Sequence, residues 1–177
     1  MKILHLGDLH LGKVINNLPM LEDQKFVLNQ AIELCKKENV YNIIISGDVY
    51  DRALPGEEAV KLFDDFLSRT VLEEHIHVYI ISGNHDSKTR LTCLNSFVEK
   101  QGLFIDGKIN DDLSMPKRVI EEDGVKINLY SLPYFFPGDI RALTNDTEIK
   151  SFESAIIKVL ENNEINEEEI KHLDGMI

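Results

Sequence analysis

The sequence has few cysteines and no apolar run long enough to cross a membrane. Its two cysteines, Cys35 and Cys93, fall within helical patterns and outside any paired motif. We therefore expect two small buried thiols, not a disulfide or a metal-binding pair. No apolar stretch approaches the roughly 20 residues that a membrane span needs. The chain runs from Met1 straight into an apolar segment with no signal peptide, so we expect no membrane partner and a cytoplasmic location.

Basic residues are also scarce relative to acidic ones. The chain has 19 Lys and Arg against 31 Asp and Glu, which gives a formal net charge of -12. This balance argues against a broad electrostatic grip on nucleic acid. It still permits chemistry on nucleic acid, because bound divalent cations reverse the local charge of a site. A DNA contact would then come from a local groove, a further segment or a partner.

Apolar runs and helical patterns alternate over the first hundred residues. The runs are typical of buried strands over 2–6, 42–46 and 78–82. The helical patterns cover 22–38, 57–73 and 88–101. This alternation predicts an α/β fold with a parallel sheet and right-handed crossovers. The second helical pattern is apolar over a broad surface, which predicts contact either with the third helix or with a second subunit.

The pattern changes after Gly102. Short strands are expected over 103–105, 118–121 and 125–131, with a hairpin turn at Asp123-Gly124. An aromatic, proline-bounded loop follows over 132–137, and a last helix over 147–161. No linker is long enough to separate two domains. We therefore expect one core over 1–160 and a poorly ordered acidic tail over 161–177.

Three short polar motifs stand directly after the three expected parallel strands. They are Gly7-Asp8-Leu9-His10, Gly47-Asp48-Val49-Tyr50-Asp51 and Gly83-Asn84-His85-Asp86. In an open parallel sheet, ligands bind outside the carboxyl ends of the strands. Each motif alone is common in solvated turns. Their joint occurrence at one edge of a sheet predicts a metal site.

The residue types suit a pair of divalent cations. An extended segment would point Asp8 and His10 the same way, and a carboxylate with an imidazole suits Mn, Fe or Zn. Asp48 can bridge two cations, and Asn84 offers a neutral oxygen to the second. Two cations roughly 3.5–4 Å apart would activate water and clamp a phosphoester. His85 is expected to act as a general acid, its ring oriented by Asp51 or Asp86.

These motifs resemble the signature of the calcineurin-like metallophosphoesterases, which is Asp-x-His, Gly-Asp-x-x-Asp and Gly-Asn-His-Asp/Glu. Within that family, four segments are similar to the SbcD nuclease subunits of bacterial SbcCD complexes, and the similarity extends over about residues 1–160. The segments are 3–12, 46–51, 82–87 and 132–135. The resemblance implies a core of β-sheet layers flanked by helices.

The resemblance also implies a ligand set and an activity. Asp8, His10 and Asp48 would hold the first metal, and Asp48 with Asn84 the second. Both ions are most often Mn, with Mg, Fe or Zn as alternatives. His85 would assist the transfer, with Asp51 orienting it. The implied activity is Mn-dependent double-strand exonuclease and single-strand endonuclease cleavage in DNA repair, recombination and replication. The implied assembly is a homodimer bound to an SbcC-like ATPase.

One part of the signature is missing from this sequence. Complete members carry a further histidine after a later strand and then a Gly-His-x-His pair, and neither occurs here. We therefore expect the amino-terminal part of a longer nuclease core, truncated at the carboxyl end. Two alternatives remain open. The same site would serve a metallophosphoesterase for small phosphodiesters or phosphoproteins, which suits the acidic charge. The missing histidines also allow a catalytically inert dimerisation module.

Overall fold

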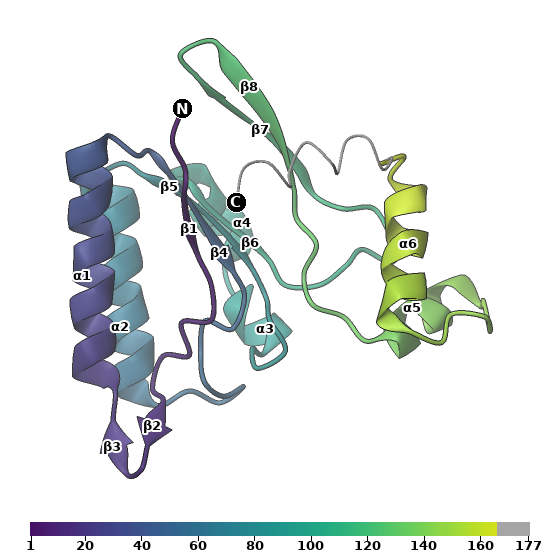
Figure 1. The fold of residues 1–177 in the computed structure, drawn as a ribbon, viewed down its shortest axis with the longest axis horizontal. Helices are drawn as coiled ribbons and strands as arrows, with labels where there is room; N and C mark the ends of the chain where they lie inside the picture. The colour runs from purple at the N-terminus through teal and green to yellow at the C-terminus, as the bar shows by residue number, and fades with distance from the viewer. Residues whose placement is uncertain (166–177) are drawn as a thin grey trace.

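A four-stranded parallel sheet forms the centre of the computed structural model, which describes residues 1–165 (Figure 1). The strand order is β1-β4-β5-β6, with bounds Leu4–Leu6, Asn42–Ser46, His77–Ile81 and Leu103–Asp106. The register aligns Leu6, Ile45, Ile80 and Ile105 across the sheet. All four strands therefore end at the same edge, and the expected α/β fold is confirmed.

Helices α1 (Leu21–Glu38) and α2 (Glu57–Leu67) lie side by side along the sheet (Figure 1). The core they form with it includes Ile32, Ile43, Phe66, Val78 and Ile80, each at most 1 % exposed. Burying a side chain of this size contributes about 1.5–3 kcal/mol. The second expected helix covers its predicted range of 57–73, since α2 continues into a wider π-helical segment over Ser68–Glu73.

The prediction of one continuous helix over 88–101 is wrong. The segment forms two single turns, α3 (Lys88–Leu91) and α4 (Asn95–Val98), followed by a 3-10 turn. Between them Leu94 adopts a left-handed backbone with φ 64°. The side chain of Asn95 accepts a hydrogen bond from the Ile105 amide at 3.2 Å, which ties this break to the sheet.

The two cysteines end up in different environments. Cys35 is 1 % exposed in the core, as predicted, and burial raises the pKa of its thiol. Cys93 is exposed, so the prediction of a second buried thiol is wrong. It lies between α3 and α4, where the predicted helix is interrupted.

A second group of elements follows the sheet. The predicted hairpin is confirmed as β7 (Lys117–Glu122) and β8 (Val125–Tyr130) around Asp123-Gly124. Helix α5 (Pro137–Thr144) was not expected, and α6 (Phe152–Asn162) begins five residues later than predicted.

A short hairpin of β2 (Val14–Ile15) and β3 (Leu18–Pro19) precedes α1 near the start of the chain.

Helices α5 and α6 lie apart from the sheet (Figure 1). They contribute to a second hydrophobic cluster, distinct from the one formed with the sheet. Ile140 and Val159 are fully buried in it. Just past α6, the side chain of Asn163 accepts from the Met115 amide and donates to the Leu113 carbonyl, both at 2.8 Å. The expected acidic tail thus begins with residues packed on this cluster, and its part from 166 onward lies outside the described residues. Within residues 1–165, no helix has the length and apolar character to cross a membrane.

Candidate metal centre

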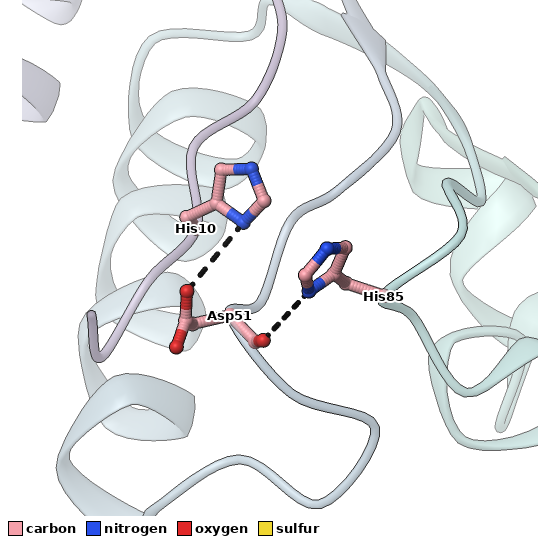
Figure 2. Close-up of side chains that lie close together, drawn as sticks. All are labelled: His10, Asp51 and His85. Atoms are coloured by element: carbon pink, nitrogen blue, oxygen red, sulfur yellow. Dashed lines mark hydrogen bonds and ion pairs between the residues drawn. The ribbon is translucent and has the colours of Figure 1, made fainter. Parts of the chain in front are cut away.

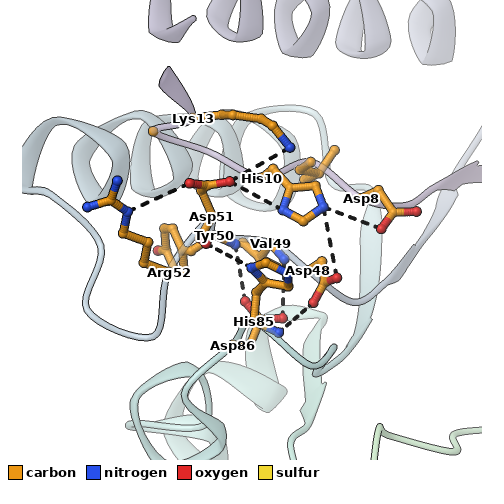
Figure 3. Close-up of polar contacts among 12 residues, drawn as sticks. Asp8, His10, Lys13, Asp48, Val49, Tyr50, Asp51, Arg52, His85 and Asp86 are labelled. Carbon is orange, nitrogen blue, oxygen red and sulfur yellow. Dashed lines mark hydrogen bonds and ion pairs between the residues drawn. The ribbon is translucent and has the colours of Figure 1, made fainter. Parts of the chain in front are cut away.

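The three polar motifs meet at the carboxyl edge of the sheet, where β1, β4 and β5 end (Figure 3). Backbone hydrogen bonds join the first motif to the second: the His10 amide donates to the Asp48 carbonyl and the Leu11 amide to the Val49 carbonyl, each at 2.9 Å. These bonds bring a loop after an edge strand into contact with the loop after its neighbour. The predicted convergence of the motifs is therefore observed.

The first motif is not extended, as the sequence reasoning assumed. Asp8 and His10 both have left-handed backbones, with φ 52° and 43°. Asp and His tolerate this conformation better than most residues. The loop curls, and His10 Nε2 comes within 3.6 Å of Asp8 Oδ1. The two side chains still converge, but through a tight turn of the backbone.

Asp48 supplies the centre of the site from the second motif. It is 8 % exposed, also has a left-handed backbone (φ 47°), and follows Gly47 at φ 83°. Its Oδ1 accepts a hydrogen bond from the His85 amide at 2.8 Å, and its Oδ2 lies 3.9 Å from His10 Nε2. Gly83 is required here by close approach, because a Cβ at that position would overlap the Asp48 carboxylate and amide.

Asp8, His10 and Asp48 fit a divalent cation. Each offers one ligand atom, and the three atoms lie within 4.8 Å of one another. Two carboxylates that converge with only an imidazole between them repel each other unless a positive charge intervenes. Carboxylate oxygen with imidazole nitrogen is a donor set for Mn, Fe or Zn. The predicted first metal site thus has the geometry to bind an ion.

Asp51 and His85 form a second group with His10 (Figure 2). The expected pairing of Asp51 with His85 is present, but through the backbone: His85 Nδ1 donates to the Asp51 carbonyl at 2.9 Å. The Asp51 carboxylate faces His10 instead, with Oδ1 3.7 Å from Nδ1. That nitrogen is buried and has no hydrogen-bond partner among the described residues. The His10 and His85 rings lie edge to face, 4.9 Å apart.

The alternative in which Asp86 orients the His85 ring is wrong. Its carboxylate binds backbone amides of Val49, Tyr50 and Gly83 at 2.9–3.2 Å. Burial and the carboxylates of Asp86 and Asp64 raise the pKa of Tyr50 to about 12. The sequence motif identified the Asp86 carboxylate, but it did not indicate that this carboxylate binds backbone amides.

Asn84 is exposed at the start of the third turn, beside His85, and its role as a ligand stays a prediction. Two basic side chains lie near the Asp51 carboxylate at the edge of the site. Lys13 Nζ lies 3.9 Å and Arg52 Nε 3.8 Å from the Asp51 carboxylate. Lys13 was not singled out from the sequence. The chain turns at Gly12 (φ 86°), and the Lys13 amide donates to the His10 carbonyl. This turn places Lys13 beside the site.

The convergent carboxylates and histidines can be compared with known families. A family model for the calcineurin-like phosphoesterases matches residues 1–173. The common chemistry of this family is metal-dependent hydrolysis of phosphoesters, and the donor set at the sheet edge suits it. The match covers nearly the whole chain, so the chain belongs to the calcineurin-like phosphoesterase family.

Proposed function

We propose that this chain is a metal-dependent DNA nuclease subunit, which hydrolyses phosphodiesters at a two-ion centre with Mn as the main metal. The observation that carries the proposal is the convergence of Asp8, His10 and Asp48 on one point, with His85 beside it. Similarity of the segments around the motifs to SbcD-type subunits supports DNA as the substrate.

Each side chain at the metal centre has a separate role in the proposed reaction. Asp8, His10 and Asp48 would hold one ion, and Asp48 with Asn84 the other. Bound ions would supply Lewis-acid stabilisation and a water of lowered pKa. His85 keeps its Nδ1 proton on the Asp51 carbonyl. Its Nε2 is therefore the nitrogen that would carry the second proton of an imidazolium and pass it to the leaving oxygen, which leaves a neutral ring still bound to the Asp51 carbonyl.

The proposal includes a homodimer that binds an SbcC-like ATPase. Support for the dimer comes from an apolar hollow of about 460 Å³ between α2 and the α3–α4 segment. Leu94 lines it and is 71 % exposed, and nearby Phe97 is 75 % exposed.

We expect Phe97→Glu to shift the chain from dimer to monomer in sedimentation analysis. A monomeric wild type would exclude the dimer.

A cleavage assay tests the proposed activity. The chain is incubated with Mn and end-labelled linear double-stranded or single-stranded DNA, beside Asp48→Ala as a matched control. We expect cleavage by the wild type and none by the variant. Calorimetry with Mn is run on the same samples. Bound Mn without DNA cleavage would contradict the nuclease assignment, and absence of Mn binding would favour an inert dimerisation module.

A second function is favoured by the net charge of -12, which suits small phosphodiesters or phosphoproteins better than DNA. The same site would serve both. A panel containing bis-p-nitrophenyl phosphate, nucleotides, a phosphopeptide and linear DNA separates the two. Faster turnover of a small substrate than of DNA would favour this second function.

A further inference from the structure

The carboxylate of Asp86 joins two of the three motifs. Asp86 closes the third motif and is 8 % exposed. Its Oδ2 accepts a hydrogen bond from the Val49 amide at 3.2 Å, and its Oδ1 accepts one from the Tyr50 amide at 3.1 Å (Figure 3). Its Oδ2 also accepts from the Gly83 amide at 2.9 Å. Hydrogen bonds to an ionised acceptor are about twice as strong as neutral ones. One buried side chain thus holds the backbone on both sides of the site.

The connection is reciprocal. Asp48 of the second motif accepts from the His85 amide of the third at 2.8 Å, while Asp86 of the third motif accepts from the two amides that follow Asp48. The first motif is attached to the same segment, because the Val49 carbonyl accepts from the Leu11 amide at 2.9 Å. The three loops therefore form one hydrogen-bonded unit, in which the buried Asp86 carboxylate links the second and third loops.

This unit fixes an uncommon backbone conformation. Asp48 has φ 47°, in the left-handed region, which Asp tolerates better than most non-glycine residues but still adopts only rarely. The amides of the next two residues, Val49 and Tyr50, are both bound by Asp86. The Asp86 carboxylate thus imposes the backbone direction just after the proposed bridging ligand.

We propose that Asp86 is a positioning residue that sets the metal ligand Asp48, with His85 beside it, in its binding position before any ion arrives. This inference rests on the metal centre of the proposed function. An asparagine at 86 has one acceptor oxygen in place of two, and its NH₂ group would face a backbone N–H. At least one of the three amides then loses its partner, and the loop after β4 is released.

Metal affinity separates positioning from general stability. The control is Asp106→Asn, which removes another buried carboxylate, 9 % exposed and paired with Arg118 on the β7–β8 hairpin. We expect Asp86→Asn to weaken Mn binding about tenfold or more by calorimetry, as for other residues that orient metal ligands. Asp106→Asn should retain wild-type affinity. Equal affinity of Asp86→Asn and wild type, or equal weakening in both variants, would overturn the proposal.

Amide exchange of the wild type tests the same inference without a variant that has to fold. In the metal-free chain, we expect the amides of Val49, Tyr50, Gly83 and His85 to be protected, and Mg to add little. Exchange of these amides at unprotected rates would overturn the preformed arrangement. If the wild type binds no metal, the proposed function fails, while exchange of the three amides bound by Asp86 still shows whether the loops are held without metal.

Discussion

Gly83 shows at the scale of one residue how closely the second and third motifs approach. A Cβ there would overlap the carboxylate and amide of Asp48. We expect Gly83→Ala to lower the free energy of unfolding by about 1–3 kcal/mol, the usual cost of overpacking, and to weaken Mn binding. The control is Gly138→Ala in α5, where an added Cβ would meet no atom within 4 Å. Urea denaturation compares the two, and a Gly83→Ala variant as stable as Gly138→Ala would contradict the close approach.

The two thiols give a second prediction at this scale. Cys35 is 1 % exposed with a raised pKa, and Cys93 is exposed. The thiolate is the reactive form, so a buried thiol with a raised pKa reacts slowly. We expect iodoacetamide to alkylate Cys93 in the native chain and Cys35 only after denaturation. Peptide mass spectrometry measures the two sites separately. Labelling of Cys35 before denaturation would show that the buried face of α1 becomes exposed to solvent in the native chain.

At the residue scale, the sequence predicted which side chains meet but not which atoms face each other. Asp8, His10 and Asp48 converge as their motifs indicated. Asp51 behaves differently, since its carbonyl holds His85 and its carboxylate faces His10. This choice depends on loop conformations that are set by distant hydrogen bonds, such as that from the His10 amide to the Asp48 carbonyl. No local pattern of residues encodes such bonds.

At the scale of elements, periodicity located the sheet and its two long helices but not the shorter pieces. The sequence reasoning treated Pro137 as the end of a loop. In the structure it is the first residue of α5, where proline suits the first helical turn. The Asp139 carboxylate accepts from the Phe136 amide at 2.9 Å and caps that helix. The acidic residue two positions after the proline was the signal that was overlooked.

The β7–β8 hairpin provides the prediction at this scale. Arg118 on β7 pairs with Asp106 at the end of β6, with side chains 16 % and 9 % exposed, and also lies over the Phe104 ring. Removing one partner of a buried ion pair costs about 3–5 kcal/mol. We expect Arg118→Ala to destabilise the chain by about this much in urea denaturation.

The double variant Arg118→Ala with Asp106→Asn is the control for that ion pair. If the pair acts as a unit, the double variant loses less stability than the sum of the two single losses. Additive losses would show that Arg118 and Asp106 stabilise the fold through separate contacts, such as that of Arg118 with the Phe104 ring. Since Lys117 stacks on Tyr130 within the hairpin, Lys117→Ala reports on the hairpin itself without touching the sheet.

At the scale of the molecule, residues 1–165 contain two hydrophobic clusters, and the metal centre adjoins the first of them. Ile45 is fully buried in the first, three residues before Asp48, and Ile140 is fully buried in the second, on α5. Neither composition nor motif spacing predicted this division. The chain reaches Ile109 of the second cluster three residues after β6 ends at Asp106. The second cluster is assembled from segments that are distant in sequence, including Ile109 and Val159.

This division predicts that stability and metal binding can be separated. Truncating a buried Ile to Ala costs about 2–5 kcal/mol, so Ile45→Ala and Ile140→Ala should both lower the free energy of unfolding in urea. Distant sites act independently to within about 0.5 kcal/mol, so Ile140→Ala should leave Mn affinity within about twofold of wild type. Ile45→Ala should weaken it more, because β4 carries Asp48. Calorimetry below each denaturation midpoint makes the comparison, and equal weakening in both variants would mean that α5 and α6 support the metal centre directly.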